Sequence, residues 1–247
     1  MLPILLSISV LSSSATAVEY VWQKISSGDV NRADLIKNTN GVFHTNNYYS
    51  PDGISWQTTT LPPHNYWINA SGYGDGTFVL TGATGQLWTS TDFENWTSRH
   101  PGGEDITDVV FGGGVFVARK YWSSSEVWVS ADLGSTWQTA NTGSVPSHSG
   151  YNFLAYGNSS FIRPANNGVH TSNDGISWNT VYPANIPADF SFKFRMYYSE
   201  NAGFFLSNVV GRDGSEVSIT TAVSSAGEEW QFYNATITTN ITGDFQS

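Results

Sequence analysis

The sequence predicts an all-β fold built from repeated four-stranded antiparallel units, and three observations support this class. First, the theme Ser, then Asp two residues on, then Trp recurs with its tryptophans at positions 56, 96, 137 and 178. Second, short runs rich in Val, Phe and Trp lie between clusters of Gly and Ser, a pattern typical of β-strands. Third, no amphipathic helical stretch follows residue 20. A period near 40 residues with four strands in each period predicts the blades of a β-propeller.

The repeated theme has four copies of similar length. They are SPDGISW (50–56), STDFENW (90–96), SADLGSTW (130–137) and SNDGISW (172–178). A fifth copy, SSAGEEW (224–230), keeps Ser224, Gly227 and Trp230 but has Ala226 in place of the aspartate. Five copies predict five visible blades.

The period from Ile106 to Ala140 predicts where the theme lies within a blade. It holds three short apolar runs, separated at Gly112–Gly114 and Ser123–Ser125, and a fourth run after the tryptophan. The theme therefore forms the turn between the third and fourth strands. In such a turn Asp accepts backbone N–H groups, Gly supplies positive φ, and Trp packs between blades. We expect a structural role for Ser50, Asp52, Trp56, Ser90, Asp92, Trp96, Ser130, Asp132, Gly134, Trp137, Ser172, Asp174 and Trp178.

The segment SADLGSTW matches the Asp-box pattern S-x-D-x-G-x-T-W at every specified position, and the other copies are one residue shorter. On this motif the chain resembles the Asp-box (BNR-repeat) sialidase-like β-propeller superfamily over residues 18–247. The resemblance implies that the Asp boxes lie on the outer part of the blades, away from a central site. It therefore favours structural over catalytic aspartates at all four positions.

Both ends of the chain carry further expectations. Residues 1–17 are apolar and then small, and Ala15–Ala17 fits a cleavage site, so we expect a secretory signal that is too short to span a membrane. Residues 19–29 resemble the segments that follow the tryptophans and predict a lone fourth strand. Residues 240–247 resemble 185–192 and predict the start of a sixth blade. Two accounts remain open: a shortened sixth blade closed by the N-terminal strand, or a propeller domain, 18–247, that is C-terminally incomplete, which we favour.

Composition excludes several kinds of function. The chain has no Cys, which excludes cysteine nucleophiles and thiolate metal sites, and its five His are isolated and lack ligand spacing. A formal net charge of −10 argues against binding nucleic acid or an anionic membrane. No Gly-rich phosphate loop is present. We predict no metal, no cofactor and no membrane span.

An enzyme of the sialidase kind is the alternative reading. Such an enzyme needs clustered arginines for a sugar carboxylate, a Tyr nucleophile assisted by Glu, and an acid/base Asp. Arg119 lies three residues after Phe116, whereas Arg163 lies two residues after Phe161. In matched registers these side chains point to opposite faces of their sheets, so the sequence places no two arginines in one pocket. The Arg-Ile-Pro motif of the family is absent near Arg32, and we assign no catalytic residue.

Two further acidic groupings have plainer interpretations. Glu104, Asp105 and Asp108 are expected on a solvated loop that enters the third blade. Tyr197, Tyr198 and Glu200 are expected on the surface of an edge strand.

The favoured function is a secreted, non-catalytic recognition propeller that binds a glycan or an extracellular protein through the loops between blades. Aromatic faces and planar polar side chains suit sugar recognition, and the loops contain both. Trp67 also fits a buried position in the core. A scaffold propeller that binds protein remains a third possible class of function. The candidate ligand-binding residues are Tyr66, Trp67, Arg99, Arg119, Tyr121, Trp122 and Arg163.

Overall fold

A computed structural model describes most of the chain after residue 36. The described residues are 37–45, 48–58, 68–99, 102–120, 125–143, 154–165, 168–182, 196–199, 203–213, 216–225, 229 and 231–238. The expected signal (1–17), the lone strand (19–29) and the start of a sixth blade (240–247) lie outside these residues.

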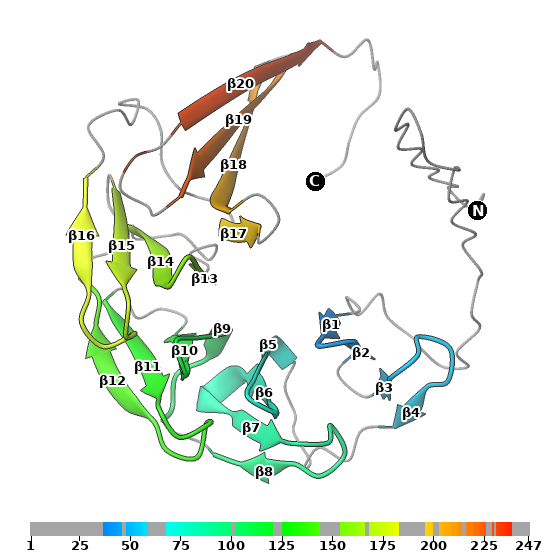
Figure 1. The fold of residues 1–247 in the computed structure, drawn as a ribbon. Helices are drawn as coiled ribbons and strands as arrows, with labels where there is room; N and C mark the ends of the chain where they lie inside the picture. Colours follow the sequence, from blue (N-terminus) through cyan, green and yellow to red (C-terminus); the bar gives the residue numbers. More distant parts are fainter. Residues whose placement is uncertain are drawn as a thin grey trace. The chain divides into compact units, whose positions relative to one another are not determined.

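The described residues form five antiparallel four-stranded sheets, each with its strands in chain order, which confirms the predicted fold class (Figure 1). Sheet A consists of β1 (Lys37–Thr39), β2 (Val42–His44), β3 (Tyr48–Ser50) and β4 (Gln57–Thr58). Sheet B consists of β5 (Ile68–Gly74), β6 (Thr77–Gly82), β7 (Leu87–Ser90) and β8 (Thr97–Ser98). Sheet C consists of β9 (Ile106–Gly112), β10 (Val115–Lys120), β11 (Glu126–Ser130) and β12 (Gln138–Asn141).

Sheets D and E repeat the same arrangement. Sheet D consists of β13 (Ala155–Gly157), β14 (Ser160–Ala165), β15 (Gly168–Ser172) and β16 (Asn179–Val181). Sheet E consists of β17 (Met196–Ser199), β18 (Phe204–Asp213), β19 (Glu216–Ser224) and β20 (Gln231–Thr238). Apart from one 3-10 turn at Ala83–Gly85, this part of the chain contains no helix.

Two-residue turns close the first hairpin of sheets A to D. In the turn Gly113–Gly114, which joins β9 to β10, both residues have positive φ, 55° and 82°. Positive φ at both central residues is the geometry whose twist matches that of the flanking strands, and it favours Gly and Asn. The corresponding turns are Asn40–Gly41, Asp75–Gly76 and Asn158–Ser159, also with positive φ throughout.

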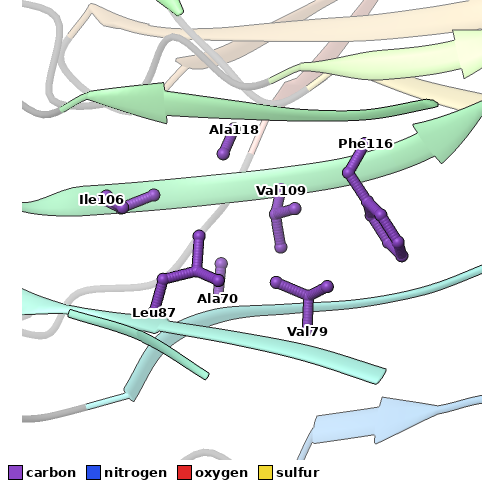
Figure 2. Packing of buried hydrophobic residues seen from close by; sticks show 7 residues of the cluster. All are labelled: Ala70, Val79, Leu87, Ile106, Val109, Phe116 and Ala118. Atoms are coloured by element: carbon purple, nitrogen blue, oxygen red, sulfur yellow. The ribbon is translucent and has the colours of Figure 1, made fainter. Parts of the chain in front are cut away.

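Consecutive sheets pack through three apolar clusters, one at each interface from A to D. In the B–C interface, Ala70, Val79 and Leu87 of sheet B meet side chains of sheet C (Figure 2). Their partners are Ile106, Val109, Phe116 and Ala118, all buried. The A–B cluster includes Tyr49 and Phe93, and the C–D cluster includes Val117 and Phe161. Burial on both faces explains why β6, β10 and β14 carry consecutive apolar residues, FVL, VFVA and FI, respectively.

An aromatic residue followed by glycine ends the first strand of sheets B, C and D. The ring of one sheet lies over the glycine of the preceding sheet: Phe111 over Gly74, Tyr156 over Gly112 and Tyr198 over Gly157. A side chain on any of these glycines would overlap the ring. The dipeptides at 73–74, 111–112 and 156–157 were a sequence signal for this packing that the motif search missed.

Because the strands are antiparallel, each sheet has two ends with different content. The turn end holds the first hairpins and the Asp-containing turns. A hairpin of one sheet can contact the next sheet there: Asn158 Nδ2, in the first hairpin of sheet D, donates to the carbonyl of Ser225, which follows β19 of sheet E, at 3.1 Å. The loop end holds the connections from second to third strands and the links between sheets. Arg99, Arg119 and Arg163 all lie at the loop end.

Candidate functional site

The four Asp-containing turns share one hydrogen-bond scheme at the turn end. Oδ1 of Asp52 accepts the backbone N–H groups of Ile54 and Ser55, both at 2.7 Å, and the Ser50 hydroxyl at 2.9 Å. Oδ1 of Asp174 accepts the equivalent groups of Ile176, Ser177 and Ser172. The carboxylate thereby closes the turn on itself, as expected for an Asp turn.

The two remaining turns vary the scheme according to their length and sequence. Asp132, whose turn is one residue longer, accepts the Thr136 N–H at 2.8 Å and its hydroxyl at 2.6 Å. Asp92 accepts two backbone N–H groups through Oδ1 and the Asn95 side-chain amide through Oδ2 at 2.8 Å. The tryptophan of the turn donates its indole N–H back to it, from Trp137 to the Gly134 carbonyl at 3.0 Å, for example.

These hydrogen bonds lower the pKa of all four carboxyl groups. The N–H groups of Ser55 and Ile54 lower the pKa of Asp52 to about 2. Hydrogen bonds from Asn95, Thr136 and Ser177 are the largest cause at Asp92, Asp132 and Asp174, respectively. A general acid or base needs a pKa near the working pH, so these exposed, acidic carboxylates are poorly suited to that task.

The lowered pKa values predict acid sensitivity of the fold. An Asp whose folded-state pKa is depressed stabilises the protein above its unfolded pKa of about 4, and this stabilisation is lost as pH falls through the folded pKa. We expect the free energy of unfolding, measured with urea, to fall between pH 4 and pH 2. The triple variant D92N/D132N/D174N should lose about 1 kcal/mol per turn at pH 6 and show a flatter pH profile. Asp75→Asn, in the β5–β6 hairpin, is the control, and an unchanged profile in the triple variant would contradict the prediction.

At the loop end, Arg119 and Arg163 enter the interface between sheets C and D. Arg119 lies on the same face of β10 as Val117, and Arg163 on the same face of β14 as Phe161, because side chains alternate along a strand. Both are buried, with 5% and 0% of their surface exposed. Arg163 Nη1 donates to Oγ1 of Thr142, which directly follows β12, at 2.8 Å. Burial, together with the nearby charge of Arg119, lowers the pKa of Arg163 to about 9.

The sequence-based conclusion that opposite faces separate these two arginines is wrong. When two sheets stack, one face of the first sheet packs against the opposite face of the second. Side chains on these two faces therefore point toward each other. The face of sheet C that carries Arg119 is the face against which sheet D packs with Arg163. The registers were predicted correctly, but which faces meet is a property of the packing.

Other polar groups border the two arginines. Asp108 is the cross-strand partner of Arg119, and its Oδ2 accepts the N–H of Leu154 at 2.8 Å, which links sheets C and D. His170 is the cross-strand partner of Arg163, and its Nδ1 is 2.9 Å from Thr180 Oγ1. Thr107 lies at a β-bulge, and its hydroxyl accepts Arg119 Nη1 at 3.3 Å. Bulges re-aim side chains in this way at many functional sites.

Two expectations for this region need correction. Asp108 is part of β9 and holds the next sheet, rather than lying on a solvated loop. Tyr198 lies in β17 with its ring against Gly157, rather than on the surface. Glu200 lies outside the described residues.

The other candidate ligand-binding residues divide between described and undescribed parts of the chain. Arg99 is partly exposed, and its Nε donates to Thr89 Oγ1 at 3.1 Å. Tyr66, Trp67, Tyr121 and Trp122 lie outside the described residues. Sequence reasoning missed Tyr182, which directly follows β16 at the loop end and is 68% exposed. A lone Tyr before a Pro gave little sequence signal.

Next to the undescribed segment 121–124, three side chains of sheet C form a charged and aromatic group. Lys120 Nζ is 2.6 Å from Glu126 Oε2 and 4.7 Å from the centre of the Trp128 ring. Among all the described residues, no three His, Asp or Glu side chains lie close enough together to hold a metal ion. The same residues include no helix long and apolar enough to cross a membrane.

Comparisons with known proteins agree on the fold alone. No protein-family model and no curated protein matches the chain. An ancestral GH74 enzyme matches with a TM-score of 0.56 and 18% identity, over 79% of this chain and 30% of the enzyme. The extracellular domain of a hybrid two-component system from B. thetaiotaomicron matches with a TM-score of 0.54 and 8% identity, over 81% and 33% of the two chains. YCF48 bound to a D1 peptide matches with a TM-score of 0.44 and 15% identity, over 78% and 76%.

The sheets and these similarities define the chain as a β-propeller protein. It spans about a third of the length of the first two propeller structures, with 30% and 33% covered.

Proposed function

We propose that the chain is a secreted, non-catalytic recognition propeller of the Asp-box sialidase-like superfamily, which binds a glycan or an extracellular protein through its loop end. The superfamily assignment rests on the four turns in which Ser and Asp bond to each other and, in three of them, the Trp indole bonds back to the turn. The signal at 1–17 and the domain limits 18–247 are part of the proposal.

The observation that carries the proposal is the difference between the two ends of the sheets. The turn end repeats the same hairpins and Asp turns, and its carboxylates are engaged within their own turns. The loop end does not repeat: its links run over 59–67, 99–105, 142–154 and 182–195. Binding residues are commonly found on variable loops held by a rigid scaffold, and the described residues Arg99 and Tyr182 lie at this end.

A sialidase-like exo-glycoside hydrolase, with catalytic residues partly outside this chain, is the alternative. The specific observation in its favour is that Arg119, Arg163 and Asp108 all border the C–D interface. Their burial argues against this alternative, because an arginine with none of its surface exposed has no contact with an external sugar in this conformation. The same burial removes Arg163 from the candidate sugar-contacting residues of the binding function.

A glycan array run beside a panel of fluorogenic sialosides tests both functions. We expect saturable binding without turnover. Trp122→Ala and Tyr182→Ala should weaken binding about tenfold, since stacking on a sugar face is worth roughly 1–1.5 kcal/mol. Ile54→Ala is the matched control, because Ile54 is also 68% exposed but lies at the turn end.

The outcomes separate the classes of function. Turnover that disappears in Arg119→Ala would overturn the proposal in favour of the hydrolase. Equal losses in Ile54→Ala and Tyr182→Ala would contradict binding at the loop end. If neither the glycan array nor the sialoside panel gives a signal, the proposal is restricted to a protein ligand.

A further inference from the structure

One edge of the Arg163 guanidinium has an unusual environment for a buried cation. Nη1 is bonded to Thr142, but neither Nε nor Nη2 has a hydrogen-bond partner among the described residues. These two atoms form the side of the guanidinium that donates two parallel hydrogen bonds to a carboxylate or a similar oxyanion. Both are buried, so water at the protein surface does not satisfy them.

The charges around this edge sum to a net positive charge. Arg119 places a second positive charge near Arg163. Asp108, the cross-strand partner of Arg119, brings one negative charge to the same interface, and its oxygens also accept the N–H groups of Val109 and Leu154. The segments that join the strands of this interface at the loop end, 121–125, 142–154 and 166–167, contain no Asp or Glu. Two arginines beside one aspartate leave one positive charge in excess, and burial of such a charge is costly, so a monovalent anion at this place would relieve that cost.

We propose that the C–D interface binds a small, planar, monovalent oxyanion, such as formate or nitrate, on the Nε–Nη2 edge of Arg163, with Arg119 supplying the second positive charge. The ligand must be small, because Arg163 has no exposed surface through which part of a larger molecule could reach it. The bound anion is thus a component of the fold that joins two sheets. The response to the anion is measured without any glycan or protein ligand, so this proposal and the proposed function can fail separately.

The experiment measures melting temperature and binding heat on the purified full chain. Sodium formate, nitrate and fluoride are compared from 1 to 100 mM at constant ionic strength, because fluoride is a single atom and cannot bridge both donors. A ligand that binds only the folded state raises the melting temperature, by about 3–5 °C per tenfold increase in anion above its Kd. Formate and nitrate should produce this rise and a saturable calorimetric signal, and fluoride should not.

Three variants locate the effect. Arg163→Met removes the guanidinium and should abolish the response to formate and nitrate, whatever it does to the baseline melting temperature. Arg163→Lys keeps the charge but loses the planar pair of donors, so the preference for planar anions over fluoride should disappear. Arg99→Met, which removes an arginine outside the interface, should respond like the unmodified protein.

The salt series on the unmodified protein decides the matter even if the Arg163 variants do not fold. Identical melting curves in the three salts, with no saturable heat, would overturn the proposal. So would an unchanged formate response in Arg163→Met, because the anion would then bind elsewhere.

Discussion

Gly112→Ala should destabilise the protein by about 3 kcal/mol, although it adds one methyl group. The new Cβ would overlap the ring of Tyr156 on the neighbouring sheet, and that ring packs against Phe161 with 4.6 Å between centroids. Because the ring also packs against the C–D cluster, it cannot move away cheaply, and overpacking of this kind costs about 1–3 kcal/mol or more. Urea denaturation followed by tryptophan fluorescence measures the loss.

A cycle of variants separates the clash from a general effect of replacing glycine. Gly103→Ala is the control, because a Cβ there would meet no atom within 4 Å. In the double variant Gly112→Ala/Tyr156→Ala the clash is absent, so its loss should be smaller than the sum of the two single losses. Additive losses would show that the ring and the glycine do not interact.

Phe93→Ala should cost about 3–5 kcal/mol, and Phe93→Gly about 1 kcal/mol less. Phe93 occupies the turn position held by Gly53 and Gly175 in other copies, with φ of 63°, a conformation that strains a residue with a side chain by about 1–2 kcal/mol. Its ring is 2% exposed and touches Tyr49 and Phe78, so it joins sheets A and B. The burial of the ring outweighs the strain, which explains why the position tolerates Phe.

The comparison of the two variants tests that balance. Alanine loses the ring and keeps the strained backbone, whereas glycine loses the ring and relieves the strain. The free energies of unfolding of the two variants, measured in the same denaturant series, should therefore rank native, then Gly, then Ala. A Gly variant less stable than the Ala variant would show that the backbone at this turn is not strained.

The repeating unit is predictable from the amino-acid sequence alone. The period of the Trp residues, the turn residues such as Asp52 and Gly53, and the Asn-Gly and Gly-Gly pairs act within a few residues of themselves, so local physics predicts their geometry. These local features predict the five sheets, their antiparallel strands and the position of the Asp turns. The geometry of a hairpin turn depends on neighbouring residues, so the local sequence is sufficient to predict it.

The contacts between the sheets depend on how the sheets stack in three dimensions, and local sequence does not specify them. The rings over Gly74, Gly112 and Gly157 belong to residues about 40 positions away, and nothing in either local segment requires the other. The same is true of Arg119 and Arg163: their registers are legible in the sequence, but their meeting depends on which face of one sheet packs on which face of the next. Side chains alternate along a strand, so each sheet has two faces whose residues can be read from the sequence. Which face of one sheet is buried against which face of the next depends on how the sheets stack.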